Sequence, residues 1–273
     1  MSGDNRIIHG QPLTVLSLFD GMSCGQQALD RIECKVEKYY AAEIDRHAVD
    51  VTQRNYPQTI QVGDVLNVRG CDLPKIDLLI GGSPCQGFSI ARGRDTSDDP
   101  RNQLMYEYVR VLREVKPTFF LYENVVMNDA AVHEISSLLG VEPVLINSDL
   151  FVPQNRPRLY WTNIPIEQLP DRPAWDYQYW QFRRNHWRQN QSGVCPCLTA
   201  NMGTGGNNVP YIEEGENKRV LTCEELEQLQ GVRAGYTAGV SATQRKKMIG
   251  NGWTVDVIAH IFKGLLSGGV ADV

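Results

Sequence analysis

The sequence predicts an α/β protein with a mostly parallel sheet and a second, smaller, loop-rich unit. Up to Gly140, short apolar runs typical of buried strands alternate with amphipathic runs typical of helices, which is the pattern of consecutive βα units. After Pro165 this pattern gives way to a segment rich in Trp, Tyr, Arg, Asn and Gly, without clear periodicity, that extends to about Asn217. The 273 residues are enough for one large domain or for one domain with a small appendage.

Each apolar run is followed by a helix-like run. We expect strand and helix pairs over residues 14–19 and 24–32, 39–44 and 47–56, 76–81 and 104–115, and 118–124 and 129–140. Two further helices are expected over 222–231, between the N-cap Thr222 and the stop Gly231, and over 254–266, which is expected to pack back on the sheet. We therefore expect residues 1–165 and 241–273 to form the main domain and residues 166–240 to form the smaller region.

Composition and charge exclude several classes of protein. The first residues lack the apolar core of a signal peptide, and no later apolar run is long enough to cross a bilayer, so we expect a soluble, intracellular protein with no membrane partner. The net charge of −5 argues against nonspecific adhesion to nucleic acid but permits a local basic surface. The seven cysteines include no C-x-x-C pair and the five histidines show no ligand spacing, so we expect reduced thiols and no metal site.

Loops that follow the predicted strands are where chemistry is expected, because ligands bind at the carboxyl ends of parallel strands. The first, "LFDGMSCG", resembles a nucleotide-cofactor loop without the G-x-G-x-x-G pattern, and Asp20 in it disfavours a pyrophosphate but suits the cationic groups of S-adenosylmethionine. Glu43, at the end of the next strand, is placed to bind ribose hydroxyls, and Asp64 in "VGDVL" to accept from an adenine amino group. A tight turn with unrelated surface carboxylates is the alternative, and three acidic strand ends favour the cofactor.

The fourth loop, "GGSPCQGFS" (81–89), is similar to the Pro-Cys loop of the DNA (cytosine-5)-methyltransferases. The other motifs of that family follow the same order along nearly the whole chain: "FDGMSCG" (19–25), "YENV" (122–125), "QNRPR" (154–158) and "GNGWTVDVI" (250–258). The C-terminal half most resembles the catalytic domains of the animal de novo methyltransferases, and the small size also suits a bacterial or phage enzyme. The resemblance places the protein in the cytoplasm of a bacterial or phage host cell, or in the nucleus of a eukaryote.

This resemblance implies a Rossmann-like S-adenosylmethionine-dependent methyltransferase sheet with a small target-recognition domain. The implied reaction moves a methyl group from S-adenosylmethionine, which becomes S-adenosylhomocysteine, to carbon 5 of a flipped-out cytosine in double-stranded DNA. Cys85, after Pro84, is the expected nucleophile toward carbon 6, and Glu123 is expected to donate a proton to ring nitrogen 3. Arg158 is expected to hold the ring oxygen with Arg156 beside it in the same motif, and Asn124 either positions the loop or contacts the exocyclic amine.

The resemblance also assigns a cofactor pocket assembled from distant motifs. The residues expected to line it are Phe19, Asp20, Gly21, Met22, Ser23, Cys24, Gly25, Glu43, Ile44, Asp64, Val65, Leu66, Gly82, Pro84, Asn251, Trp253 and Val255. For Trp253, a place in the hydrophobic core is the alternative to a place in the cofactor wall. The cysteines other than Cys85 are expected to be structural.

DNA contacts are expected from a stretch that interleaves aromatic and basic residues, "DYQYWQFRRNHWRQNQ". The alternative is a solvated basic loop whose aromatics are buried. The residues expected at the DNA are Ser89, Arg183, Arg184, Arg188, Thr199, Asn201 and Arg245. The animal relatives carry an arginine that reads guanine near the position of Asn201, and asparagine pairs best with adenine, so the loop from Leu198 to Asn208 is expected to select flanking bases other than a strict CpG.

Two rival functions share most of these features. An RNA cytosine-5 methyltransferase would keep every catalytic motif and differ in the recognition segment. A catalytically silent paralogue that only binds DNA or a partner enzyme would not need the intact Pro84-Cys85 and Glu123-Asn124 pairs. The sequence assigns neither the oligomeric state nor the recognised DNA site.

Overall fold

The structure is a computed structural model of the chain, and it describes residues 11–84, 103–183, 185–202 and 209–266. Its main body is a seven-stranded sheet in the order β3-β2-β1-β4-β5-β7-β6. The strands are β1 (Leu13–Leu18), β2 (Val36–Ala42), β3 (Ile60–Gln61), β4 (Leu78–Gly81), β5 (Phe119–Val125), β6 (Val144–Asn147) and β7 (Pro157–Thr162). All neighbours are parallel except β7, which is antiparallel to both β5 and β6. The predicted α/β fold with a mostly parallel sheet is confirmed.

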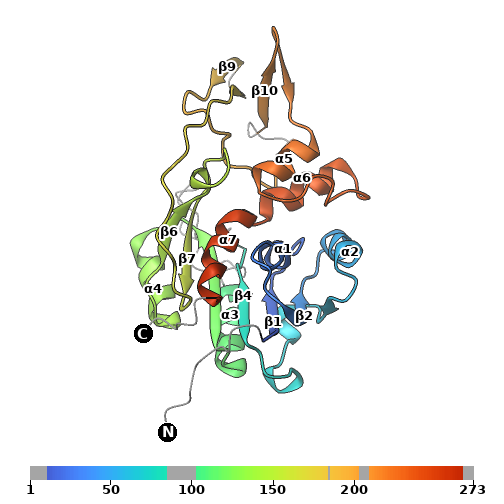
Figure 1. Cartoon of the computed structure of the whole chain (residues 1–273), viewed down its shortest axis with the longest axis vertical. Coiled ribbons are helices and arrows are strands. Elements are labelled where there is room, and N and C mark those ends of the chain that lie inside the picture. The colour runs from blue at the N-terminus through green and yellow to red at the C-terminus, as the bar shows by residue number, and fades with distance from the viewer. Residues whose placement is uncertain (1–10, 85–102, 184, 203–208, 267–273) are drawn as a thin grey trace.

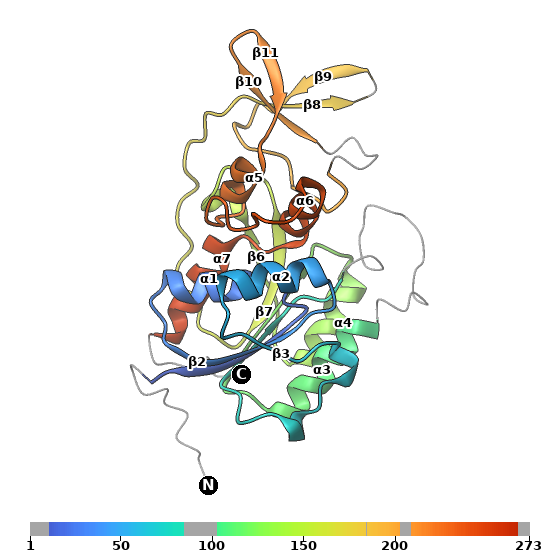
Figure 2. The same ribbon diagram turned by 90° about the vertical axis from the view of Figure 1, so that its right-hand side faces the viewer.

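Helices cover both faces of this sheet. Figure 2 shows α1, α2 and α7 on one face and α3 and α4 on the other. Their bounds are α1 (Cys24–Arg31), α2 (Arg46–Asn55), α3 (Gln103–Val115), α4 (Asp129–Leu139) and α7 (Val255–Phe262). Because side chains alternate along a strand, Val15 of β1 packs with the first layer of helices and Leu16 with the second. The sheet is therefore buried on both sides, and its polar strand ends are left for a site.

Local signals fix where several helices begin and end. Asn128 caps α4 by accepting from the backbone N–H of Ala131, and Gly140 ends that helix with a left-handed backbone, φ 76°. Thr222 and Glu225 form a reciprocal capping box at the start of α5 (Cys223–Leu229), so the predicted N-cap is confirmed. Ser241 caps α6 (Ala242–Asn251), a helix that the sequence analysis did not predict.

A second, four-stranded antiparallel sheet lies at one end of the molecule, beyond α5 and α6 (Figures 1 and 2). It consists of β8 (Tyr179–Arg183), β9 (His186–Gln189), β10 (Pro210–Glu214) and β11 (Asn217–Val220), in the order β11-β10-β8-β9. The sequence analysis expected a loop-rich unit here and did not predict these strands. They are four or five residues long and carry polar side chains on both faces, so their alternation is not visible in the sequence. The domain limits at 165 and 241 stay predictions.

Within the described residues, no helix is long and apolar enough to cross a membrane. No group of three or more His, Cys, Asp or Glu side chains in this part of the chain is arranged to hold a metal ion.

Candidate active site

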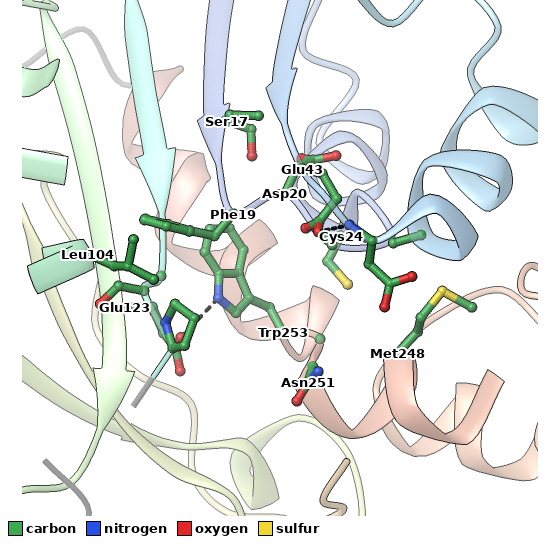
Figure 3. A pocket seen from close by; sticks show the side chains of 18 of the residues that line it. Ser17, Phe19, Asp20, Cys24, Glu43, Leu104, Glu123, Met248, Asn251 and Trp253 are labelled. Carbon is green, nitrogen blue, oxygen red and sulfur yellow. Dashed lines mark hydrogen bonds between the residues drawn. The ribbon is translucent and has the colours of Figure 1, made fainter. Parts of the chain in front are cut away.

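A cavity of about 390 Å³ opens at the carboxyl ends of β1, β2, β4 and β5, where the connection from α6 to α7 closes over it. Figure 3 shows the indole of Trp253 reaching from that connection into the middle of the cavity. The predicted site residues that line it are Phe19, Asp20, Gly21, Cys24, Glu43, Ile44, Asp64, Val65, Gly82, Pro84, Glu123, Asn124, Arg156, Arg158, Asn251 and Trp253. Tertiary structure thus brings five distant motifs to one cavity.

Five predicted cofactor residues lie outside this lining. Met22, Ser23, Gly25 and Val255 are buried behind it, and Leu66 is half exposed away from it. Cys85, Ser89 and Arg184 fall outside the described residues, as does the side chain of Arg183. The lining also contains Asp45, Lys247 and Met248, which the sequence analysis did not assign to the pocket. Lys247 stands in the basic run "RKK" (245–247), which gives no local signal of a cavity.

The loop after β1 has a strained backbone. Phe19 and Ser23 have left-handed φ angles, at 57° and 61°, which cost side-chain-bearing residues energy, whereas Gly21 between them adopts φ 58° without strain. The backbone N–H of Gly21 donates to Glu43 at 2.7 Å, and the other oxygen of Glu43 accepts from the N–H of Ile44 at 2.8 Å. Glu43 therefore ties the first two strand ends together at the cavity wall.

Asp20 lies in this loop as a buried carboxyl. Its Oδ1 accepts from the hydroxyl of Tyr39 at 2.8 Å, and no hydrogen bond of good geometry reaches its buried Oδ2 within the described residues. Burial raises the pKa of Asp20 to about 6, and the charge of Glu43 adds to this, while nearby hydroxyls partly offset it.

Glu123, at the end of β5, is held from two sides. Its Oε1 pairs with Nε of Arg158 at 3.1 Å, and its Oε2 accepts from Nε1 of Trp253 at 3.0 Å. Gly82 makes this approach possible, because a Cβ there would lie 2.8 Å from Oε2 of Glu123 and 3.1 Å from the indole nitrogen. The predicted proton donor and the predicted cofactor wall are thus directly hydrogen-bonded.

Arg156 is buried, with 3% of its surface exposed, and it connects separate segments of the chain by hydrogen bonds. Its guanidinium donates to the carbonyl oxygens of Leu198, at 2.8 Å, and of Gly250 and Gly252, at 3.2 and 2.8 Å. These bonds join the residue that precedes β7 to Leu198 and to the end of α6. Since its donors are taken by main-chain acceptors, Arg156 fixes the geometry of the site.

Asn124 is also buried, and its amide is engaged inside the protein. Its Nδ2 donates to the hydroxyl of Tyr122 at 2.9 Å, and that hydroxyl lies 2.7 Å from Oγ of Ser83. Ser83 immediately precedes Pro84. Of the two roles expected for Asn124, this chain of hydrogen bonds favours positioning of the Pro-Cys loop.

Cys197 stands beside both arginines of the site. Its sulfur lies 3.5 Å from Nη1 of Arg156 and 3.8 Å from Nη2 of Arg158. Burial alone would raise the pKa of this thiol, but the two positive charges outweigh it and lower the pKa below its ordinary value. The sequence analysis left Cys197 as structural, and its place in "CPC" next to no basic residue gave no signal of these contacts.

The residues expected at DNA are divided between different environments. Trp180, Phe182 and Trp187 share one face of the four-stranded sheet, where Lys218 lies 4.0 Å above the Trp180 ring. Arg188 is opposite Gln181 and lies on the other face, exposed and without an ion pair within the described residues. Phe182 and Trp187 are exposed, so the alternative of buried aromatics does not hold for them.

Arg245 has a different environment from that expected. It donates to Thr237 at 2.8 Å and pairs with Glu224 and the fully buried Glu227, at 2.7 and 3.0 Å. Its guanidinium therefore stabilises the α5–α6 region, and the acidic partners in "TCEELEQ" were the available signal. Thr199 is half-buried with a hydroxyl that has no partner within the described residues, and Asn201 is exposed.

Comparison with known proteins assigns the family. Residues 13–170 and 161–267 match the family described as C-5 cytosine-specific DNA methylase, so the chain belongs to that family. The type II methyltransferase M.Bsp6I of Bacillus sp. strain RFL6 is 28% identical over 84% of this chain and 91% of its own length. The orphan methyltransferase M.SPRI of Bacillus phage SPR is 37% identical, over 61% of this chain and 41% of its own length. The chain is a DNA (cytosine-5-)-methyltransferase by family, and the predicted class is confirmed.

Solved structures agree in fold. Dnmt2 methyltransferase of S. pombe superposes with a TM-score of 0.68 at 17% identity and covers 93% of this chain and 98% of its own. The Entamoeba histolytica methyltransferase EhMeth gives a TM-score of 0.70 at 16% identity, over 94% and 98%. These likenesses confirm the Rossmann-like methyltransferase fold.

The cavity fits S-adenosylmethionine, the methyl donor that this family implies. Its lining includes the carboxyl groups of Asp20, Glu43 and Asp64, which suit a cationic ligand with hydroxyl and amino groups. Phe19 and Trp253 add aromatic rings that attract cations. No glycine-rich phosphate cradle is present in the loop after β1, in agreement with a ligand without phosphate.

Proposed function

We propose that this chain methylates carbon 5 of a flipped-out cytosine in double-stranded DNA, through a covalent adduct with Cys85. The proposal is supported above all by one observation. Glu123, Arg158 and the Ser83-Pro84 pair that precedes Cys85 share a single cavity with Asp20 and Glu43. A cytosine ring placed against Glu123 and Arg158 would therefore be next to a ligand held by Asp20 and Glu43.

The methyl donor supplies an electrophilic methyl group when it is bound, and Asp20, Glu43, Asp64 and Trp253 would hold it. The thiolate of Cys85 adds to carbon 6 of cytosine, which makes carbon 5 nucleophilic. Glu123 protonates ring nitrogen 3, and Arg158 fixes Glu123 and the ring oxygen. After carbon 5 has gained the methyl group, a base removes the proton of carbon 5. Ring nitrogen 3 then returns its proton to Glu123 as the bond from Cys85 to carbon 6 breaks, which restores the thiolate.

The described polar network keeps these groups in place. The hydrogen bonds from Asn124 through Tyr122 to Ser83 orient the chain at Pro84. Arg156 binds the carbonyl of Leu198, so the loop that follows, with Thr199 and Asn201, is anchored at the edge of the cavity. We assign base selection to this loop and phosphate contacts to the four-stranded sheet.

The covalent step is tested with duplex DNA that contains 5-fluorocytosine. Fluorine cannot leave as a proton does, so a complex that resists denaturation is expected only when S-adenosylmethionine is present. Cys85→Ala is expected to form none, and Cys223→Ala, at a cysteine outside the cavity, is the matched control that traps normally. A trapped Cys85→Ala complex would assign the nucleophile to another residue.

The substrate is tested by comparing duplex DNA with transfer RNA in the same assay. Methylation of the duplex alone is expected, and bisulfite sequencing of DNA from cells that express the protein would then identify the modified sites. Methylation of transfer RNA alone would support the RNA methyltransferase. Binding of DNA without methylation by the intact chain would support a silent paralogue.

A further inference from the structure

The sulfur of Cys197 lies against both arginines of the candidate active site. It accepts from Nη1 of Arg156 at 3.5 Å and from Nη2 of Arg158 at 3.8 Å. A cysteine sulfur accepts whether or not it carries its proton, and as a thiol this one also donates to the carbonyl oxygen of Leu198 at 3.5 Å. Both arginines line the cavity, whereas Cys197 lies outside the lining and has no task in the proposed reaction.

Arg158 is held in the cavity wall by contacts at each nitrogen of its guanidinium. Its Nε pairs with Glu123 at 3.1 Å, its Nη1 donates to the carbonyl oxygen of Pro157 at 2.8 Å, and its Nη2 has the sulfur of Cys197. Contacts on different edges of a planar guanidinium fix the orientation of its plane. An arginine has more N–H donors than these bonds use, so donors remain for a ring oxygen in the cavity.

Arg156 in turn fixes the position of the sulfur. Its Nη1 donates to the sulfur and also to the carbonyl oxygen of Leu198, the next residue along the chain, while its Nη2 donates to Gly252 at 2.8 Å. Because Arg156 is buried and bound to the main chain of two segments, the sulfur that it contacts is a fixed point for the more mobile end of Arg158.

We propose that Cys197 is a positioning residue, which holds Arg158 in the orientation that clamps Glu123 and the ring oxygen of the target cytosine. This inference rests on the proposed function. Cys197 immediately precedes the loop that begins at Leu198, to which we assign base selection, so its sulfur joins that loop to the group that holds the base. The two positive charges lower the pKa of this thiol, and a thiolate accepts more strongly than a thiol.

A residue that orients Arg158 acts on the chemical step and has little effect on binding. Since Cys197 lies outside the cavity lining, its loss should leave the affinities for S-adenosylhomocysteine and for duplex DNA nearly unchanged. A misplaced Arg158 should instead slow the attack on the cytosine ring. A cysteine that served only the packing of the protein would lower stability and affinity together with the rate.

Single-turnover trapping on duplex DNA with 5-fluorocytosine, at saturating S-adenosylmethionine, measures the rate of that step. Cys197→Ala is expected to slow trapping about tenfold, near the lower end for a lost hydrogen bond to a charged group. Cys197→Ser keeps an acceptor of similar size and should restore most of the rate. Cys195→Ala is the matched control, because Cys195 is more deeply buried and no hydrogen bond joins its sulfur to an arginine within the described residues. It should keep the rate.

A double-mutant cycle shows whether the sulfur acts through Arg158. Arg158→Lys keeps the positive charge, but a single ammonium group cannot reproduce the planar contacts of a guanidinium. In that background Cys197→Ala is expected to change the trapping rate by less than about twofold. A further loss as large as that in the unmodified protein would mean that the sulfur acts elsewhere, which would overturn the inference.

An unchanged trapping rate in Cys197→Ala would also overturn the inference, as would an equal loss of rate in Cys195→Ala. If Cys197→Ala does not fold, Cys197→Val takes its place, because valine preserves the volume and offers no acceptor. Failure of the unmodified protein to trap or methylate DNA would instead overturn the proposed function, so the two failures are distinguishable.

Discussion

The cavity and the four-stranded sheet give an arginine side chain different environments, as Arg156 and Arg188 show. Arg156, in the cavity, is 3% exposed and binds three carbonyl oxygens, whereas Arg188, in the four-stranded sheet, is exposed and has no ion pair within the described residues. The hydrogen bonds of the buried guanidinium offset the cost of its desolvation, and they hold the segments that it contacts in fixed positions. The exposed one keeps its donors for a ligand such as a phosphate.

The contrast between the two arginines would be wrong if Arg156 could be replaced without loss of stability. Arg156→Ala leaves the carbonyls of Leu198 and Gly250 without this donor, at about 1 to 3 kcal/mol for each, whereas Gly252 keeps the amide of Gln230, so the free energy of unfolding is expected to fall by at least about 2 kcal/mol. Urea denaturation measures this. Arg188→Ala should change the same quantity by less than about 0.5 kcal/mol. Equal losses in the two variants would contradict the contrast.

A second test concerns cofactor binding by the cavity. Glu43→Ala is expected to weaken binding of S-adenosylhomocysteine by about 1.5 to 3 kcal/mol, the range for a hydrogen bond to a charged group. It also removes the acceptor for the N–H groups of Gly21 and Ile44. Calorimetry gives the affinity, and Glu37→Ala, at an exposed glutamate on the same strand, is the matched control. Unchanged affinity would remove Glu43 from the site.

The loop after Leu198 lies along the chain between the cavity and strand β10. We expect a substitution in this loop to change the preference for the bases that flank the target. Asn201→Arg is expected to shift preference toward guanine next to the target, with discrimination changed by roughly 1 to 3 kcal/mol and little loss of turnover. Methylation of a randomised duplex library, read at base resolution, measures the preference. Identical profiles for the two proteins would show that Asn201 does not read a base.

The smallest effect is expected from a substitution in the four-stranded sheet, and it concerns DNA binding. Arg188→Ala should weaken DNA binding evenly across sequences and reduce the slope of log affinity against log salt by about 1, because one phosphate contact is lost. Fluorescence anisotropy over a salt series measures the slope. Arg245→Ala is the control: its guanidinium is bound to Glu224 and Glu227, so stability should fall while the slope stays. A reduced slope for Arg245→Ala would instead indicate that Arg245 contacts DNA.

Local sequence predicted the core of the fold well, because strand and helix periodicity is set by neighbouring residues. The first four predicted strand and helix pairs correspond to β1 with α1, β2 with α2, β4 with α3 and β5 with α4. Capping residues such as Thr222 act within one turn, so they also were visible. The short strands β8 to β11 form two hairpins, β8 with β9 and β10 with β11, and they were missed because the sheet is completed only by pairing of β8 with β10, which are separated along the chain.

Residue patterns and motifs were enough to predict the class of fold, the family and the motif residues from which the cavity is built. The contacts that each of those residues makes inside the cavity depend on how distant segments pack together. Glu123 meets Trp253 across 130 positions and Arg156 meets Gly252 across 96, and neither contact follows from local pattern. Burial and partners set the charge and the available donors of a polar side chain, and both depend on which distant segments pack around it. Hence Arg245 is held in an ion-pair cluster with Glu224 and Glu227, and no cation of the described residues acts on Asp20.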